Sequence, residues 1–184
     1  ALCLVGSEMC IRDSLKHREL PFRSTNDPYK IWRSEIMLQQ TQINTAVPYY
    51  NQWVKMYPTL SHVAKAKFSK LLKIWEGLGY YARCNNFHKS SKIVMDQYNG
   101  VIPHDHKKFM TLPGVGEYTA AAVLSIAFNK KIPAIDGNVK RVMSRYLGIK
   151  NLTPKNYNRI KNKLKSWIPN QRPGDFNQAM MDFG

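Results

Sequence analysis

The sequence has few cysteines, few acidic residues and no long apolar run. A membrane-spanning helix needs roughly 20 consecutive apolar residues, and no stretch of the 184 residues approaches that length. The three cysteines, Cys3, Cys10 and Cys84, have no metal-type spacing and cannot all pair with one another. These absences argue against a membrane protein and a disulfide scaffold, and they indicate a reducing, intracellular compartment.

Basic residues outnumber acidic ones by 28 to 12, which leaves a formal net charge of +16. Lys and Arg gain binding free energy from phosphates by releasing counterions, whereas solubility alone does not require such an imbalance. We therefore expect a nucleic-acid partner; a basic surface without that role is the alternative. Hydrophobic residues make up 43% of the chain, which is enough to bury a core and excludes overall disorder.

Helical spacing recurs between short Pro, Gly and Asn breaks, and no stretch alternates convincingly as a strand, so the expected class is all-α. Asp27-Pro28 is typical of a helix start, an N-cap followed by proline. That helix is expected through Leu38, and others near 44–56, 59–64, 69–76, 81–98, 109–112, 117–128, 138–146, 157–168 and 176–183. Residues 1–14 have no helical period and make a poor signal peptide, so we expect a leader outside the fold; a cloning or assembly remnant is one possible origin. The last pattern stops at Gly184 without a cap, which suggests a truncated chain.

The run Leu112-Pro113-Gly114-Val115-Gly116 directly precedes the long apolar helix expected at 117–128. Free backbone N–H groups at a helix N-terminus bind anions, and on this chain the expected anion is a nucleic-acid phosphate. We expect Gly114 and Gly116 to permit positive φ and close approach of a strand. The alternative is a plain turn between two helices.

Two carboxylates are candidate catalytic groups. Glu35 lies among the apolar residues of its helix, and a carboxyl with little hydration holds a proton near neutral pH, as a general acid must. The alternative is a surface Glu, or one paired with Arg33. Asp136 precedes a helix start, where an N-cap is the ordinary role and competes with pointing into a cleft. Two carboxylates beside a glycosidic bond can nevertheless divide the chemistry, one as acid and one as stabilising anion.

Seven runs of the sequence, in this order, resemble the MutY-type adenine DNA glycosylases of the helix-hairpin-helix superfamily. The resemblance covers about residues 15–184, and its most specific runs are SEIMLQQTQ, GLGYYAR and FNQAMMD. The runs are LPFR at 20–23, PYKIW at 28–32, SEIMLQQTQ at 34–42, GLGYYAR at 77–83, LPGVG at 112–116, DGNVKRV at 136–142 and FNQAMMD at 176–182.

The resemblance assigns roles to individual residues. Glu35 matches the acid that protonates N7 of adenine, and Asp136 matches the anion that stabilises the oxocarbenium ion or bonds to C1′ transiently. Residues that match the adenine pocket are Arg23, Leu38, Tyr118, Gln178 and Met181. Residues expected to contact DNA are Gln39, Gln40, Tyr80, Leu112, Gly114, Val115, Gly116, Asn138 and Lys140, with the carbonyls of Met110, Leu112 and Val115 as a candidate cation site bridging to phosphate. From the residues alone, Gln39-Gln40 could be a polar helix end and Tyr80 a core or rim residue.

The sequence also departs from the family pattern at several points. Tyr118 stands where the endonuclease III type has a nucleophilic lysine, which implies a monofunctional glycosylase or a weak lyase, and Phe22 replaces the usual Trp. A [4Fe–4S] cluster is expected in the full-length protein, but its four cysteines are absent from this chain, as is the 8-oxoguanine-reading domain.

The resemblance implies a six-helix lobe at 28–135 that contains the helix-hairpin-helix motif, a second lobe from 15–27 plus 136–184, and an active-site cleft between them. The implied function is removal of adenine opposite 8-oxoguanine or guanine in double-stranded DNA, by a monomer located with DNA. An endonuclease III-like glycosylase/lyase for damaged pyrimidines and a non-catalytic DNA-binding fragment are the alternatives.

Overall fold

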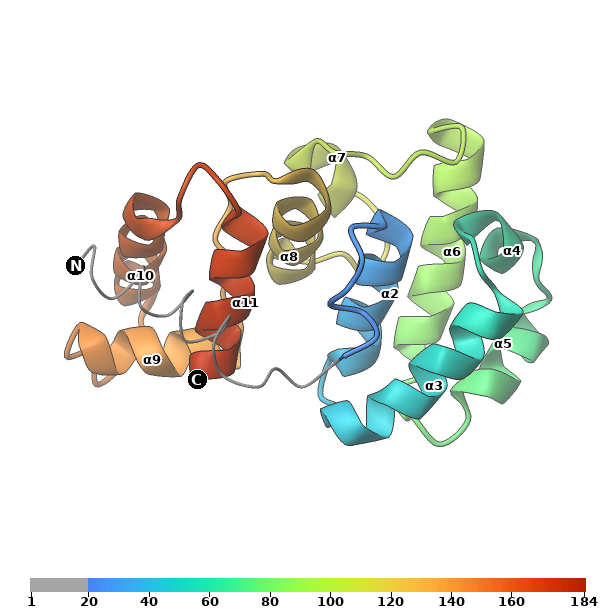
Figure 1. The fold of residues 1–184 in the computed structure, drawn as a ribbon, viewed down its shortest axis with the longest axis horizontal. Helices are drawn as coiled ribbons and strands as arrows, with labels where there is room; N and C mark the ends of the chain where they lie inside the picture. Colours follow the sequence, from blue (N-terminus) through green and yellow to red (C-terminus); the bar gives the residue numbers. More distant parts are fainter. Residues whose placement is uncertain (1–19) are drawn as a thin grey trace.

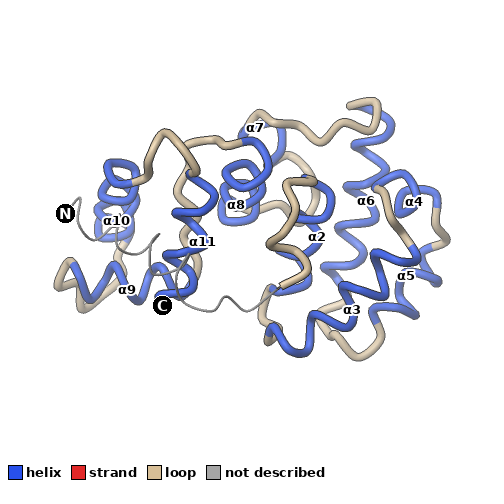
Figure 2. Tube along the Cα trace, in the orientation of Figure 1, coloured by secondary structure: helices blue, strands red, loops and turns tan. Residues whose placement is uncertain are grey.

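A computed structural model describes residues 20–184; the expected leader at 1–14 lies outside this range. The described residues form helices joined by loops and turns, with no strand among them, so the all-α class is confirmed (Figure 2). The helices are α2 (Pro28–Leu38), α3 (Ile43–Met56), α4 (Leu60–Lys65), α5 (Phe68–Trp75), α6 (Ala82–Gln97), α7 (His106–Met110), α8 (Glu117–Phe128), α9 (Gly137–Tyr146), α10 (Pro154–Trp167) and α11 (Pro173–Phe183).

Local capping determines where the helices begin. The Asp27 carboxylate accepts hydrogen bonds from the backbone N–H of Tyr29 at 2.9 Å and of Lys30 at 3.4 Å, as the Asp-Pro start signal predicts. The apolar pattern alone places three other starts too late. These helices begin at a cap or a proline instead: Asp105 before α7, Thr153-Pro154 at α10 and Pro173 at α11.

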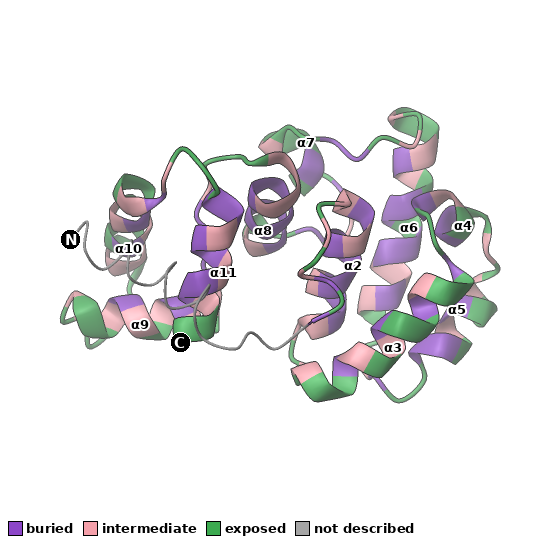
Figure 3. Ribbon diagram, viewed as in Figure 1, coloured by how far each residue is buried: buried purple, intermediate pink, exposed green. Residues whose placement is uncertain are grey.

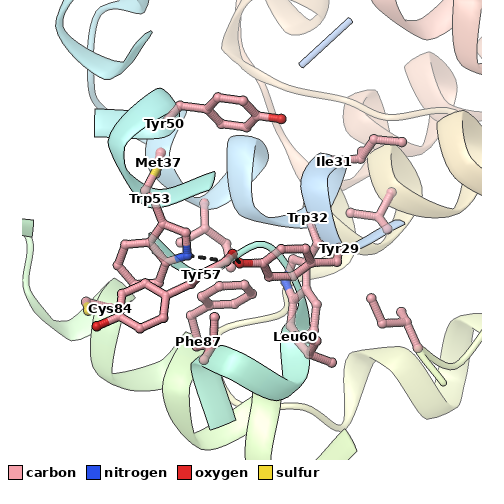
Figure 4. Close-up of a cluster of buried hydrophobic side chains, with 14 of the residues drawn as sticks. Tyr29, Ile31, Trp32, Met37, Tyr50, Trp53, Tyr57, Leu60, Cys84 and Phe87 are labelled. Carbon is pink, nitrogen blue, oxygen red and sulfur yellow. Dashed lines mark hydrogen bonds between the residues drawn. The ribbon is translucent and has the colours of Figure 1, made fainter. Parts of the chain in front are cut away.

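An aromatic cluster fixes the position of α2 (Figure 4). The indole N–H of Trp53 donates to the Tyr29 hydroxyl at 3.1 Å, and that hydroxyl donates to the carbonyl of Tyr57 at 2.5 Å. The Trp32 ring packs edge-on against Phe87 and Phe109, with centroid distances of 5.0 and 5.1 Å. Each such aromatic pair contributes about 0.5–1.5 kcal/mol beyond its buried area. Aromatic side chains of α3, α6 and α7 thereby hold in place α2, the helix that carries Glu35.

The described residues contain a second, smaller cluster built from α9, α10 and α11, in which Val139, Met143, Ile160, Leu164 and Phe176 are buried. Figure 1 shows these three helices at one end of the molecule, α3 to α6 at the other, and α8 between them. The range 28–135 holds seven helices, α2 to α8, rather than the expected six; the count includes the five-residue α7.

The segment before α2 touches both parts of the structure. Leu20 and Phe22 pack in the first cluster, and Phe22 contacts Tyr50 with its ring edge at 5.4 Å. Arg23, by contrast, forms an ion pair with Asp182 of α11. The grouping of residues 15–27 with the second lobe therefore stays a prediction. No helix in the described range is both long and apolar enough to cross a membrane.

Close packing of α11 on α8 joins the two parts. Small residues line α8, where residues 119–125 are all buried (Figure 3). Gly174 lies so near α8 that an added Cβ would come within 2.6 Å of the Ile126 Cα and 2.8 Å of the Ser125 carbonyl oxygen. The buried Asn177 amide then donates to Ser125 Oγ at 2.8 Å and to the Ile132 carbonyl at 2.9 Å, and its oxygen accepts from the Ala134 N–H at 3.0 Å.

The change Gly174→Ala tests this contact. The new methyl group would meet backbone atoms that cannot rotate away, and overpacking of this kind costs about 1–3 kcal/mol. We expect a lower free energy of unfolding in urea titrations. Gly137→Ala is the matched control because an added Cβ there meets nothing within 4 Å. Equal stabilities of the two variants would contradict the close packing.

Candidate active site

Glu35 is partly buried on α2 and accepts a hydrogen bond from the Tyr118 hydroxyl of α8, with 2.7 Å between Tyr118 Oη and Glu35 Oε2. Burial raises the pKa of Glu35 above its ordinary value of 4.5. The Tyr118 hydrogen bond lowers that pKa, the Asp136 charge raises it and the Arg23 charge lowers it; the net direction is upward. A carboxyl in this environment retains its proton to higher pH than an exposed one, which suits a general acid.

The alternative of a pair between Glu35 and Arg33 is wrong. Arg33 is fully buried on another face of α2, with its guanidinium 4.0 Å from the Tyr50 ring centroid and 5.1 Å from that of Tyr29. Within residues 20–184 its nitrogens have no hydrogen-bond acceptor. The faces of both tyrosine rings lie against this charge and stabilise it.

Asp136 caps α9 and also acts on the Glu35 site. Its Oδ1 accepts the Val139 N–H at 2.7 Å, which is the N-cap geometry. Its charge contributes to the raised pKa of Glu35 and of Tyr118. The structure gives Asp136 Oδ2 no hydrogen-bond donor within the described range. The cap therefore uses one oxygen of the carboxylate, and a catalytic role for Asp136 stays a prediction.

Tyr118 connects three helices at this site. Burial is the largest cause that raises its pKa well above 10.0, and the Glu35 charge adds to it, so the phenol stays neutral. Its hydroxyl also lies 3.7 Å from the Met181 sulfur of α11. Of the residues expected to line an adenine pocket, Tyr118 and Met181 are thus brought to Glu35.

Arg23 is held by an acid that the sequence interpretation missed. Its two terminal nitrogens donate to the two carboxylate oxygens of Asp182, both at 2.5 Å. Asp182 closes the FNQAMMD run, but nothing in its neighbours along the chain indicates a partner 159 positions away. The remaining predicted pocket residues, Leu38 and Gln178, are half-buried and form no hydrogen bond to Glu35 in the described structure.

Two surface cavities lie elsewhere. One of about 590 Å³ is bounded by α5 and the start of α6, including Phe68, Leu72 and Tyr81. Another of about 270 Å³ lies beside Asp27 and Pro58. Neither is lined by Glu35 or Asp136, so neither is the predicted adenine pocket.

The hairpin before α8 requires glycine at one of its two positions. Gly114 has φ +77°, and a Cβ there would meet the Asn86 Cβ at 2.8 Å. Gly116 does not use the positive φ that a glycine permits: it has φ −89° and serves as the N-cap of α8, with nothing near an added Cβ. The space around Gly116 leaves room for a ligand at the helix start.

The hairpin carbonyls are partly engaged within the turn. The Leu112 carbonyl accepts the Val115 N–H at 3.1 Å, and the Pro113 carbonyl accepts the Ser90 hydroxyl at 2.8 Å. Leu112 and Val115 are buried, whereas Met110 is exposed. The cation site at the carbonyls of Met110, Leu112 and Val115 stays a prediction.

The residues expected to contact DNA differ in how they are presented. Gln40 and Tyr80 are exposed, and Tyr80 retains 61% of its accessible surface, so the interpretation of Tyr80 as a core residue is wrong. Gln39 instead donates from Nε2 to the Thr119 hydroxyl at 3.3 Å. The Asn138 amide oxygen accepts from Arg141 at 2.8 Å, and the Lys140 ammonium lies 5.6 Å from the Tyr157 ring centroid.

Residues 33–170 match the family model described as HhH-GPD superfamily base excision DNA repair protein. The chain belongs to this superfamily. It is 40% identical over 168 residues to the adenine DNA glycosylase of Buchnera aphidicola subsp. Baizongia pistaciae, covering 91% of this chain and 48% of that protein. It is 36% identical to the human adenine DNA glycosylase, covering 91% of this chain and 33% of that protein. The chain thus spans about half the length, or less, of these relatives.

Solved structures show the same fold. A thermostable thymine-DNA glycosylase superposes with a TM-score of 0.89 at 30% identity, covering 98% of this chain and 84% of that one. An endonuclease III in a non-covalent DNA complex superposes with a TM-score of 0.80 at 24% identity, covering 99% and 83%. The helix-hairpin-helix glycosylase fold expected from the sequence is confirmed.

The change Glu35→Gln is expected to stabilise the protein at neutral pH. Because the pKa of Glu35 is higher in the folded than in the unfolded chain, its contribution to stability is fully present below pH 4.5 and is lost as pH rises through the folded pKa. Gln does not titrate and avoids this loss. Each unit by which folding raises the pKa of Glu35 lowers the free energy of unfolding at neutral pH by about 1.4 kcal/mol.

Urea unfolding at several pH values measures this effect. The stability gain of Glu35→Gln over the parent should grow from acid to neutral pH and then level off. Asp96→Asn, which removes an exposed carboxylate from α6, is the control and should change little. A gain that is largest in acid would contradict the raised pKa.

Proposed function

We propose that the chain carries the catalytic part of an adenine DNA glycosylase that hydrolyses the N-glycosidic bond of adenine mispaired with 8-oxoguanine or guanine. The observation that carries the proposal is the partly buried Glu35, hydrogen-bonded by Tyr118 and acted on by the Asp136 charge. The similarity to proteins named adenine DNA glycosylase supports adenine as the base. The fold's likeness to an endonuclease III solved with DNA supports a DNA partner, which we propose is double-stranded.

The proposed reaction begins with the protonated Glu35 carboxyl. It donates its proton to N7 of an adenine that has been flipped out of the duplex, which makes the base a neutral leaving group. The bond between N9 and C1′ breaks with its electron pair leaving on the base, and the sugar becomes an oxocarbenium cation. The Asp136 carboxylate stabilises this cation. Water then adds to C1′ and gives its proton to the Glu35 carboxylate, which restores the acid.

A monofunctional reaction fits the groups around Glu35. A lyase step requires an amine that forms an imine with C1′, whereas the side chain hydrogen-bonded to Glu35 is the neutral phenol of Tyr118. The Lys140 ammonium lies over the Tyr157 ring. Water is therefore the proposed nucleophile, and any lyase activity is expected to be weak.

The described residues do not fit an iron–sulfur cluster. Cys84 is single and buried, and burial raises its thiol pKa to about 12, which disfavours the thiolate that a cluster needs. No group of three or more metal-ligating side chains occurs between residues 20 and 184. We propose that a [4Fe–4S] cluster of the complete protein takes its ligands from outside this chain. We further propose that the protein acts as a monomer on DNA inside the cell.

Thymine excision is a second candidate, because the thymine-DNA glycosylase structure has a TM-score of 0.89 and is 84% covered by this chain. Single-turnover assays of the complete protein on A:8-oxoguanine, A:G and T:G duplexes decide between the two. We expect adenine release, and we expect Glu35→Gln to reduce it by about 10²-fold or more, the lower end of general acid–base contributions. Asp96→Asn is the control. Release of thymine alone, or full activity of Glu35→Gln, would overturn the proposal.

The change Tyr118→Phe is expected to move the alkaline limb of the rate profile to higher pH. The Tyr118 hydroxyl stabilises ionised Glu35 and so lowers its pKa; without it, Glu35 stays protonated at higher pH. A hydrogen bond to a charged group is worth about 1.5–3 kcal/mol, which sets an upper bound of roughly two pH units. Single-turnover rates measured between about pH 5 and pH 9 locate the alkaline limb, because this range spans roughly two pH units on each side of neutrality. Tyr57→Phe is the control, and a limb that moves downward would contradict the assignment.

A further inference from the structure

Two residues proposed to probe the duplex have left-handed backbones and come from separate loops. Gln40, with φ +54°, follows α2, and Tyr80, with φ +49°, precedes α6. Both side chains are exposed, so neither is held by burial in the core. A side chain in this region is strained, and such strain persists only where the surrounding structure imposes it.

Arg83 imposes the path of the chain on the α2 side. Its Nη1 donates to the carbonyls of Ile36 at 2.9 Å, Met37 at 3.0 Å and Gln39 at 2.5 Å. These carbonyls end α2, where the helix no longer supplies N–H partners and where a positive charge is favourable. The guanidinium thereby holds the residue directly before Gln40.

The same guanidinium holds the other loop with its second terminal nitrogen. Nη2 donates to the carbonyls of Leu78 at 3.2 Å and Gly79 at 3.1 Å, and to the Thr41 hydroxyl at 3.3 Å. The Trp75 indole N–H also donates to the Gly79 carbonyl, at 3.0 Å. The residues on both sides of Gln40 and the residue before Tyr80 are therefore tied to one group.

The ring of Tyr80 also lies against this guanidinium, with 5.3 Å between Arg83 Cζ and the ring centroid. Trp75 lies on the guanidinium as well, at 5.5 Å. The Arg83 Nε is buried and meets no acceptor within residues 20–184. With both terminal nitrogens engaged by protein oxygens and Nε enclosed, Arg83 is not arranged to bind a DNA phosphate.

We propose that Arg83 is a positioning residue that sets the relative position of Gln40 and Tyr80, so that the two side chains enter the duplex as a unit. This inference rests on the proposed function, because it needs Gln40 and Tyr80 to contact DNA. It assigns Arg83 no contact with the reacting atoms. The sequence interpretation missed it, since an arginine at the second position of a helix is ordinarily a surface residue.

A double-mutant cycle between Arg83→Met and Tyr80→Ala tests the proposal in the complete protein. The readouts are the dissociation constant for an A:G duplex, the fluorescence of 2-aminopurine placed at the target adenine, and the pH profile of single-turnover release. We expect Arg83→Met to weaken mismatch binding and base flipping by up to about 10²-fold, the loss that a 1 Å misplacement can cause. Adding Tyr80→Ala should then cost far less than it does in the parent, and the alkaline pH limb should not move.

Two further variants keep the result interpretable. Arg159→Met removes an exposed arginine of α10 and controls for the loss of one charge. Arg83→Lys keeps the charge, but its single side-chain nitrogen cannot reach both loops. If Arg83→Met does not fold, the double-mutant cycle between Arg83→Lys and Tyr80→Ala tests the positioning role instead. We expect Arg83→Lys to resemble Arg83→Met in flipping.

The outcomes distinguish a failure of the Arg83 positioning role from a failure of the proposed function. Additive effects of Arg83 and Tyr80 substitutions, or full flipping by Arg83→Lys, would overturn the positioning role while Glu35-dependent adenine release still stands. Unchanged flipping in both Tyr80→Ala and Gln40→Ala would also overturn it, because there would be nothing to position. If adenine release itself is absent, the proposed function fails, and binding and 2-aminopurine fluorescence still measure the coupling.

Discussion

The hydrogen bond between Tyr118 and Glu35 joins α2 to α8. It lowers the pKa of Glu35, which burial raises. Burial disfavours the charged form of Glu35, while the phenol donates to that same form. The resulting acid holds its proton longer than an exposed glutamate, yet its conjugate base still has a donor. A general acid that later accepts a proton needs both states to be accessible. The rest of the structure places these two side chains against each other.

Each helix of the site is fixed by a different kind of packing. The aromatic cluster around Trp32 and Trp53 holds α2, whereas small residues let α11 approach α8 closely at Gly174. Asn177 then satisfies the buried polar groups between α8 and the segment leading to Asp136. The geometry of the candidate site thus depends on contacts that lie outside it.

Much of the fold could be predicted from local patterns, because caps and apolar periodicity act over a few residues. The bounds of α8 were predicted at residues 117–128 and are confirmed, and the Asp27-Pro28 start of α2 is confirmed. Of the two hairpin glycines expected to permit a left-handed backbone, Gly114 adopts it and Gly116 does not. A glycine is compatible with both signs of φ, so its presence does not determine which one the turn adopts.

The sequence by itself determined the all-α class, the superfamily resemblance and the identity of Glu35 as a carboxyl in an apolar stripe. The tertiary structure decided that Tyr118 donates to Glu35, that Asp182 holds Arg23, and that one arginine ties two loops together. These pairs lie 83, 159 and, for Arg83 with Gln39, 44 residues apart in the chain. Periodicity and capping carry no information over such separations, since only the packing of whole helices brings those side chains within hydrogen-bond distance.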